Sequence, residues 1–401
     1  MSSAHSTDAA ADAAPDTVGG LARLGAAVEA ARHAKPGFPR EAQAAYDALF
    51  TVPGPVAAPV RRGLAALAAR RHGAADVAAH HAGAGADPAL FADEAPDDPA
   101  LRAAVEHVDL LTTSPALVRR ADTDRLAAAG WTPDETVVIA QTAAFTAFLV
   151  RLVHGLRLID GTAEPATAPL ERATPARGRT KSTATTSANG GARPVAYTQE
   201  LLSWTPWVPP VASDDLTDEQ REAFAGKTND AYFRLLSRAP GLLRARTAVD
   251  HAVFYTRDGL PRAERELAAA AASKVNDCVY CASVHSRKAS QMSKRTADVQ
   301  RVLDASLPRD QDWRALDLAP LSAGQDARWA AVVDFAAALS TTPVSATERH
   351  LADLRSHGIT DAELVDLVGS VAFFAWANRL MLTLGEPFWP GTEPAAAPAP
   401  A

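Results

Sequence analysis

The sequence predicts an all-α protein built from two related helical domains. Long segments of Ala, Leu and Arg with few alternating β-branched residues favour helices, and an internal repeat indicates the duplication. With 401 residues the chain is too long for one ordinary core and suits two domains. Helix starts are expected at three capping boxes: Thr217–Gln220, Ser345–Glu348 and Thr360–Glu363.

The repeat relates GWTPDETVVIAQTAAFTAFLVRLVHGL, which starts at Gly130, to GITDAELVDLVGSVAFFAWANRLMLTL, which starts at Gly358. The matching positions are Thr132 with Thr360, Glu135 with Glu363, Phe145 with Phe373, and Arg151 with Arg379. Any two amphipathic helices look alike, but a shared cap, aromatic residue and arginine in one register favour duplication. The apolar run 137–150 in the first copy is shorter than the roughly 20 residues of a membrane span, so a buried helix is expected.

Carried upstream, the comparison places PVRRGLAALAARRHGAADVAAHHAGA against the segment that holds both cysteines of the chain. Gly63–Leu64 then stands opposite Glu266–Leu267. In this register Ala75, Ala78 and Ala82 occupy the positions of Cys278, Cys281 and His285. The first half is therefore expected to have the fold without the chemistry.

Composition divides the chain into five segments. A Pro-, Thr-, Ala- and Gly-rich stretch without apolar period cannot bury enough surface to offset its chain entropy, so it predicts a flexible linker. The expected segments are a disordered leader (1–19), a cysteine-free domain (20–160), the linker (161–195), a catalytic domain (196–390) and a disordered tail (391–401). The N-terminus has neither the basic start nor the apolar core of a signal peptide, so a cytoplasmic protein is expected.

The net charge of −7 does not favour binding to nucleic acid or to an anionic membrane surface, both of which require basic residues. Small neutral substrates or protein partners are expected instead. In a reducing cytoplasm, a close cysteine pair is more often catalytic or metal-binding than a structural bridge.

Cys278 and Cys281 are the only cysteines, and His285 follows four residues after the second. Asn276 and Asp277 are good N-cap residues, so a helix is predicted to begin at Cys278 and to carry both thiols and His285 on one face. The start of a helix favours an anion, which predicts a lowered thiol pKa. His285 would take or relay the thiol proton, and Glu266 would fold back to complete the relay.

Two other uses of a C-x-x-C pair fit less well. A zinc site needs about four ligands and would have to recruit His285 plus His251 or Glu266. A thioredoxin-type motif follows a strand, and no strand is predicted before Cys278. A metal is therefore not expected, and dithiol chemistry requires no organic cofactor.

The pattern Glu266, Cys278, Cys281 and His285, embedded in RAERELAAAAASKVNDCVYCASVH, resembles the alkyl hydroperoxidase D and carboxymuconolactone decarboxylase family, above all its peroxidase-related branch. The resemblance is strong over residues 196–390, including AFFAWANRLMLTLGEPFWP, and the first half looks like a divergent copy. It implies an all-helical fold that assembles as trimers or hexamers, and a thiol peroxidase reaction.

By this resemblance Cys281 would be the peroxidatic cysteine, Cys278 the resolving one, and Glu266 with His285 the proton relay. The partners would be a peroxide and an external dithiol reductant. Tyr280 stands where the better-known hydroperoxidases often have a histidine. Tyr280, Phe373 and Trp376 are candidates for a substrate pocket, although aromatic residues at helical spacing are more often core.

Three alternatives stay open: a non-enzymatic, redox-sensitive binding or scaffold protein, a lactone decarboxylase-like enzyme, and a thiol–disulfide oxidoreductase without peroxidase activity. For assembly, two tandem copies would satisfy one family interface within the chain, so three chains would form a closed six-domain ring. A homotrimer is expected, with a dimer as the alternative.

Overall fold

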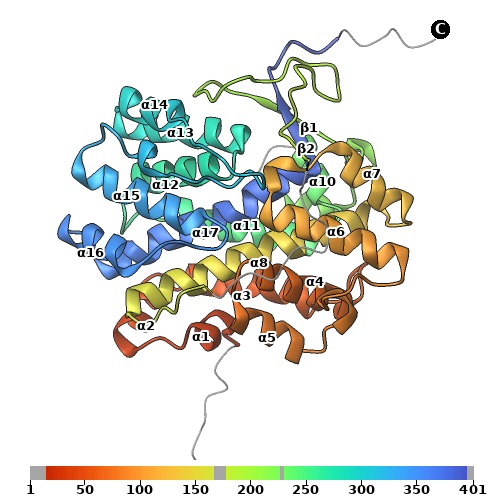
Figure 1. Cartoon of the computed structure of the whole chain (residues 1–401), viewed down its shortest axis with the longest axis horizontal. Helices are drawn as coiled ribbons and strands as arrows, with labels where there is room; N and C mark the ends of the chain where they lie inside the picture. The colour runs from red at the N-terminus through yellow and green to blue at the C-terminus, as the bar shows by residue number, and fades with distance from the viewer. Residues whose placement is uncertain (1–14, 167–177, 226–229, 395–401) are drawn as a thin grey trace, which may run out of the picture.

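A computed structural model describes residues 15–166, 178–225 and 230–394 (Figure 1). Helices dominate it, which confirms the all-α prediction. In the described residues the strands are β1 (Ser203–Pro206) and β2 (Gly385–Phe388), which pair antiparallel with Ser203 opposite Phe388. The expected leader and tail fall mostly outside the described residues, although α1 already begins at Thr17.

The helices of the first half are α1 (Thr17–Ala22), α2 (Ala26–His33), α3 (Gly37–Phe50), α4 (Ala58–Arg71), α5 (Ala75–Gly83), α6 (Pro99–Thr113), α7 (Arg120–Ala128) and α8 (Pro133–Asp160). Those of the second half are α9 (Asp218–Ala223), α10 (Ala231–Leu236), α11 (Pro240–Phe254), α12 (Arg262–Val275), α13 (Val279–Ser293), α14 (Thr296–Asp304), α15 (Ala327–Ser340), α16 (Glu348–Ser356) and α17 (Asp361–Leu384). The short 3-10 helices are η1 (Pro88–Leu90), η2 (Pro115–Leu117), η3 (Ser213–Asp215) and η4 (Ala319–Leu321).

The helices of the two halves begin and end at corresponding positions. This correspondence differs by one residue from the alignment predicted for the upstream segments. Helices α4 and α12 have equal length. The turn between α4 and α5 is as long as the turn between α12 and α13. Gly73 and Asp277 both have positive φ, 73° and 60°, just before the second helix of each pair. Equivalent side-chain contacts agree, because Arg61 donates to the carbonyls of Leu49 and Val52 as Arg265 does to those of Val253 and Thr256.

The register predicted from alanine-rich segments is therefore wrong by one residue. Ala74, Val77 and His81 stand opposite Cys278, Cys281 and His285, rather than Ala75, Ala78 and Ala82. Arg62, rather than Gly63, stands opposite Glu266. The alignment slipped because alanine runs carry almost no register information.

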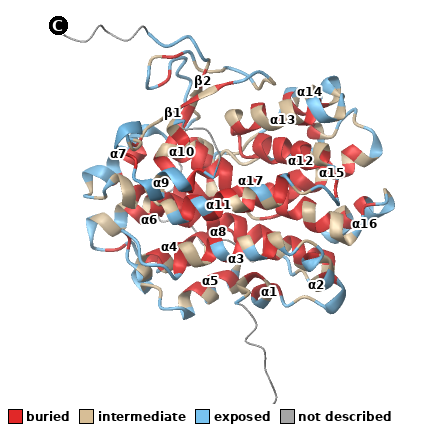
Figure 2. Cartoon of the chain, turned by 180° about the vertical axis from the view of Figure 1, so that it is seen from behind, coloured by how far each residue is buried: buried red, intermediate tan, exposed pale blue. Residues whose placement is uncertain are grey.

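Equivalent helices of the two halves pack on each other. Helix α8 lies along α17, and α3 lies along α11, so α8 and α17 cross the middle of the molecule (Figure 1). Trp376 on α17 donates its Nε1–H to Gln141 on α8 at 2.7 Å across this interface. Both long helices are sufficiently long and apolar to span a membrane, but their apolar windows are 100% and 94% buried inside the protein, as Figure 2 shows in red.

Two buried arginines cap helices across the interface between the halves. Arg151 on α8 donates to the carbonyls of Ser340 and Thr341 at the end of α15, at 3.1 and 2.8 Å. Arg379 on α17 donates to the carbonyl of Thr112 near the end of α6, at 2.8 Å. Carbonyls at helix C-termini lack partners within their own helix, so each half supplies a cationic donor for the other. This exchange explains why both repeats carry the arginine.

Most predicted helix starts are confirmed. Thr217 and Thr360 form capping boxes with Gln220 and Glu363. The predicted box at Ser345–Glu348 is wrong, because Ser345 lies in the turn before α16, where its N–H bonds to Thr341 Oγ1. Thr347 caps α16 instead, with His350 in the reciprocal position.

The second part of the expected linker contacts both halves. Arg179 donates to Asp122, and Lys181 Nζ lies 2.5 Å from Asp277 Oδ2, directly before Cys278. Residues 167–177 lie outside the described residues.

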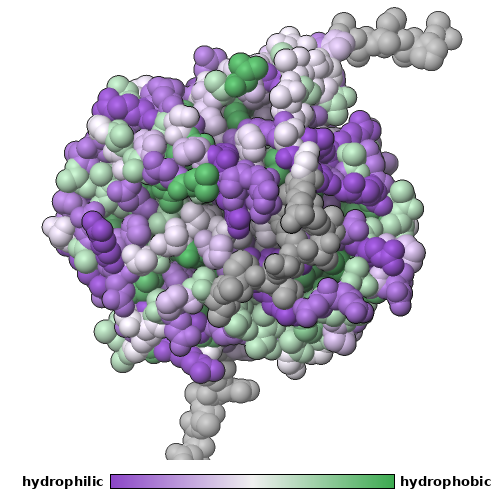
Figure 3. Space-filling view, viewed as in Figure 1, coloured by the Kyte–Doolittle hydropathy of each residue, from purple (hydrophilic) through white to green (hydrophobic). Residues whose placement is uncertain are grey.

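On the face that Figure 3 shows, hydrophobic side chains are scattered among hydrophilic ones.

Candidate active site

The turn between α12 and α13 positions the two cysteines. Asn276 is the C-cap of α12, Asp277 is left-handed, and Cys278 is the N-cap of α13. Cys278 makes no side-chain capping bond. The predicted N-cap roles of Asn276 and Asp277 are therefore wrong, because the tight turn needs Asn276 to end one helix before the next can begin.

Asp277 fixes this turn through its side chain. Lys181 Nζ and Trp313 Nε1 donate to Asp277 Oδ2 at 2.5 and 2.6 Å, and the Tyr197 hydroxyl donates to Oδ1. Burial raises the pKa of Asp277, but the charges of Lys181 and Arg309 outweigh it and leave the pKa below its ordinary value. The left-handed residue before Cys278 is thus held by a buried carboxylate.

The two sulfur atoms lie side by side. Cys278 Sγ and Cys281 Sγ are 3.0 Å apart, and both are free thiols with only 1% and 5% of their surfaces exposed. A disulfide bond measures about 2.05 Å, so a small sulfur displacement would join them. The predicted proximity of the thiols at the start of a helix is present in this structure.

The predicted lowering of the thiol pKa is not found in this dithiol state. Burial raises the pKa of Cys281 well above its ordinary value, and the hydrogen bond with Cys278 raises it further. The charge of Arg246 acts in the opposite direction. Removal of the thiol from water therefore outweighs the favourable field at the start of α13.

Glu266 and His285 form a hydrogen-bonded pair between α12 and α13. His285 Nδ1 lies 2.5 Å from Glu266 Oε2, and Arg262 Nε lies 3.1 Å from Glu266 Oε1. Glu266 is fully buried, which raises its pKa, but the charge and hydrogen bond of His285 prevail and lower it. The ionised carboxylate orients the ring of His285, which lies one helical turn beyond Cys281.

The aromatic candidates have different surroundings. Tyr280 is partly exposed next to the thiols, and burial raises its pKa. Phe373 lies 6.2 Å from the ring of Phe254, which in turn lies 5.6 Å from His285. Trp376 is fully buried between the halves, 5.0 Å from Phe145, and contributes to the interface core.

Sequence reasoning missed several residues around the thiols. Phe374 lies closer to His285 than Phe373 does, with ring centroids 4.2 Å apart. Arg246 on α11 lies 5.0 Å from the ring centroid of Phe373 and 5.7 Å from that of Tyr232 on α10, and its charge acts to lower the pKa of Cys281. Phe254 could have been found from the sequence, because Phe50 occupies the equivalent position at the end of α3 in the first half. That comparison requires the correct alignment of the two halves.

The first half keeps part of this arrangement. His81 is fully buried against Phe50, and burial lowers its pKa to about 3. Arg62, opposite Glu266, donates to the Tyr46 hydroxyl and cannot accept a proton from His81. With Ala74 and Val77 opposite the cysteines, this half lacks both the thiols and the carboxylate of the relay.

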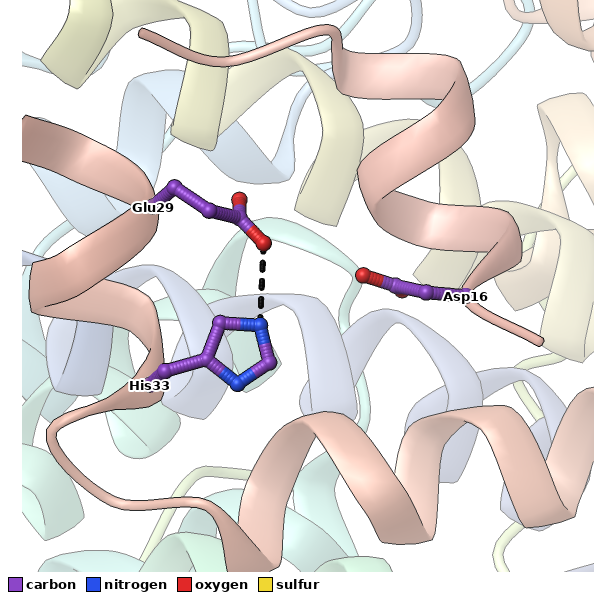
Figure 4. A group of neighbouring side chains, drawn as sticks. All are labelled: Asp16, Glu29 and His33. Atoms are coloured by element: carbon purple, nitrogen blue, oxygen red, sulfur yellow. Dashed lines mark hydrogen bonds and ion pairs between the residues drawn. The ribbon is translucent and has the colours of Figure 1, made fainter. Parts of the chain in front are cut away.

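One further cluster has the composition of a metal site. Asp16, Glu29 and His33 offer ligand atoms within 4.8 Å of one another (Figure 4). Arg32 already donates two bonds to Asp16 and one to Glu29, so both carboxylates have a cationic partner. This ion-pair network fixes α1 against α2.

The fold and the site together define a helical protein with a buried C-x-x-C dithiol and a Glu–His pair. Residues 240–322, from the start of α11 to just beyond η4, match the carboxymuconolactone decarboxylase family. This matched segment includes Glu266, both cysteines and His285.

Comparison with solved structures finds a chain described as the alkylhydroperoxidase AhpD core, an uncharacterized peroxidase-related protein from Ralstonia eutropha JMP134. The two share 24% sequence identity, and the match covers 51% of this chain and 95% of the other with a TM-score of 0.37. No curated protein matches the chain.

Proposed function

We propose that the protein is a thiol-dependent peroxidase that reduces alkyl hydroperoxides or hydrogen peroxide through a dithiol–disulfide cycle. The observation that carries the proposal is the 3.0 Å separation of Cys278 Sγ and Cys281 Sγ, with the Glu266–His285 pair one helical turn away. Two adjacent thiols suit a reaction in which one sulfur is oxidised and the other removes the oxygen.

In the first step the Cys281 thiolate attacks a peroxide oxygen, and the O–O bond breaks. Cys281 becomes a sulfenic acid, and the departing alkoxide or hydroxide takes up the proton that His285 received from the thiol. Cys278 then attacks the sulfenic sulfur, which forms the disulfide and releases water. An external dithiol reduces the disulfide and is itself oxidised.

This cycle uses no metal and no organic cofactor, because sulfur carries both electrons. It requires a reducing compartment, so our proposal places the protein in the cytoplasm. The assignment of Cys281 as the attacking thiol is what the resemblance to the alkyl hydroperoxidase D family implies, and its place in the first turn of α13, on the same helix as His285, is compatible with that role.

The test is peroxide consumption in the presence of a dithiol reductant, with each cysteine replaced in turn. Cys281→Ser is expected to abolish turnover, whereas Cys278→Ser should consume one equivalent of peroxide and stop at the sulfenic acid. Each variant serves as the control for the other, and mass spectrometry after one equivalent locates the oxygen. A stable oxidised adduct on Cys278 in the Cys281→Ser protein would reverse the two roles.

The matched family is named for a decarboxylase, which makes lactone decarboxylation the second candidate. That chemistry needs acid–base groups and no dithiol, so the Glu266–His285 pair would serve it and the cysteines would be dispensable. Turnover of a carboxymuconolactone by the Cys278→Ser/Cys281→Ser protein would favour the decarboxylase. A folded protein inactive in both assays would favour a redox-sensitive binding protein.

A further inference from the structure

Asp277 adopts a backbone conformation that its counterpart in the first half reaches without a side chain. Both residues are left-handed, with φ of 60° at Asp277 and 73° at Gly73, and each directly precedes the N-cap of its helix. A glycine enters this region without steric cost, whereas a residue with a side chain is strained there. The turn itself therefore does not require a carboxylate, and the side chain of Asp277 must have another reason.

Three donors from outside α12 and α13 converge on this carboxylate. Lys181 Nζ and Trp313 Nε1 donate to Oδ2 at 2.5 and 2.6 Å, and the Tyr197 hydroxyl donates to Oδ1. Trp313 is itself left-handed, with φ of 62°, so two strained residues meet in one hydrogen bond. Such strain persists only where the surroundings hold it, and it is concentrated at functional sites. The turn before Cys278 is thus fixed by groups that lie outside its own two helices.

Two of the three donors lie on residues 178–197, which we call the strap. Near its start the strap is bound to the first half, because Arg179 donates to both carboxylate oxygens of Asp122 on α7, at 3.0 and 2.9 Å. The carbonyl of Thr180 also accepts a bond from Arg119 Nη2 at 2.6 Å. The strap therefore connects the first half to the turn that carries the cysteine pair.

We propose that Asp277 is a positioning residue for Cys278, and that the strap makes the first half a part of the dithiol site. The inference rests on the proposed function only in taking Cys278 and Cys281 as a dithiol–disulfide pair. The equilibrium constant for an intramolecular disulfide depends on how closely the two thiols are held. Their sulfur atoms are 3.0 Å apart, and the turn that Asp277 fixes leads directly into Cys278. Release of this turn lowers the effective concentration of one thiol at the other.

The test measures the equilibrium between the protein disulfide and dithiothreitol, in which two electrons and two protons pass from dithiothreitol to the protein. Lys181→Met and Asp277→Asn should each shift this equilibrium about tenfold towards the dithiol, because each removes a charge-assisted bond that holds the turn. Asn tolerates the left-handed conformation as Asp does. The two substitutions change the charge beside Cys278 in opposite directions, so an effect of charge alone would shift the equilibrium in opposite directions. Lys181→Arg should retain most of the parent constant.

Arg179→Met releases the strap from Asp122 and should shift the equilibrium about threefold in the same direction. Arg349→Met is the matched control, because it removes an equal charge from the exposed surface of α16 and should leave the constant unchanged. Equal constants for the parent, Lys181→Met and Asp277→Asn, all folded by circular dichroism, would overturn the proposal, and so would opposite shifts in the two variants.

If Asp277→Asn does not fold, Lys181→Met is compared with Lys181→Arg, and equal constants for these two variants would overturn the proposal. A constant equal to that of the parent in Arg179→Met would overturn the role of the first half. Because dithiothreitol replaces peroxide in this measurement, the peroxidase function is tested separately. A parent without peroxide turnover, in which the shifts remain, would count against the peroxidase function alone.

Discussion

At the scale of single residues, the site combines groups that burial affects in opposite ways. Burial raises the pKa of Cys281 and keeps the thiol neutral, whereas Glu266 stays ionised because His285 compensates the same loss of water. The resting site thus holds its negative charge on Glu266, away from the sulfur. Transfer of the thiol proton to His285 would create the Cys281 thiolate at the moment of attack, and the Glu266 carboxylate would stabilise the protonated ring.

Replacement of Glu266 by Gln tests whether Glu266 is ionised in the resting site. The pKa of Glu266 lies below its ordinary value of 4.5 in the folded protein, so its carboxylate stabilises the fold above that value, and the contribution is lost as pH falls through the folded-state pKa. The free energy of unfolding of the parent should therefore fall more steeply than that of Glu266→Gln between about pH 5 and about pH 3. Urea unfolding across this range provides the measurement.

The exposed Glu219→Gln is the control and should keep the pH dependence of the parent. Glu266→Gln should also slow oxidation of Cys281 at pH 7, by about a hundredfold, because Gln cannot stabilise a protonated His285. If the free energy of unfolding depended on pH in the same way in the parent and in Glu266→Gln, the pKa of Glu266 would not be lowered by its contact with His285.

At the scale of helices, the sequence supported those features that local rules determine. Thr360 and Glu363 cap α17 as predicted, since a capping box needs only neighbouring residues. The repeat between α8 and α17 was visible because Phe145 and Arg151 fix its register. The upstream alignment lacked such markers and slipped by one position. The contact of Arg246 with Phe373 could not be predicted, because it arises from the packing of α11 against α17 and no local pattern in the sequence records it.

Helix capping between the halves gives a prediction for Arg151. Arg151→Met removes the donors to Ser340 and Thr341 and leaves buried carbonyls at the end of α15 without partners. The expected loss is about 2–4 kcal/mol in the free energy of unfolding, measured with urea. Arg120→Met, on a side chain that is 59% exposed, is the control and should change stability by less than about 0.5 kcal/mol. An equally small effect of Arg151→Met would mean that water or other donors replace the cap.

At the scale of the whole molecule, the two halves repeat one arrangement of helices and pack against each other. Equivalent helices meet at the interface between the halves, α8 with α17 and α3 with α11, as expected for an internal pseudo-twofold pair. The first half has the corresponding helices and the buried His81, and it has neither the two thiols nor a carboxylate opposite Glu266. Its contribution to the second copy includes the Arg151 cap and the Gln141 bond to Trp376. In the described residues the first half thus supplies packing and helix-capping contacts to the second half.

The internal pairing leads to a prediction about assembly. Each chain has already buried one interface between its copies, so only its outer faces remain for contacts between chains. Three chains with two copies each close a six-domain ring, and closed rings leave no unsatisfied face. We therefore expect a homotrimer with three times the chain mass of 42.0 kDa. Static light scattering at micromolar concentration measures the mass directly; twice the chain mass would support a dimer, and a mass near 42.0 kDa would exclude assembly through the outer faces.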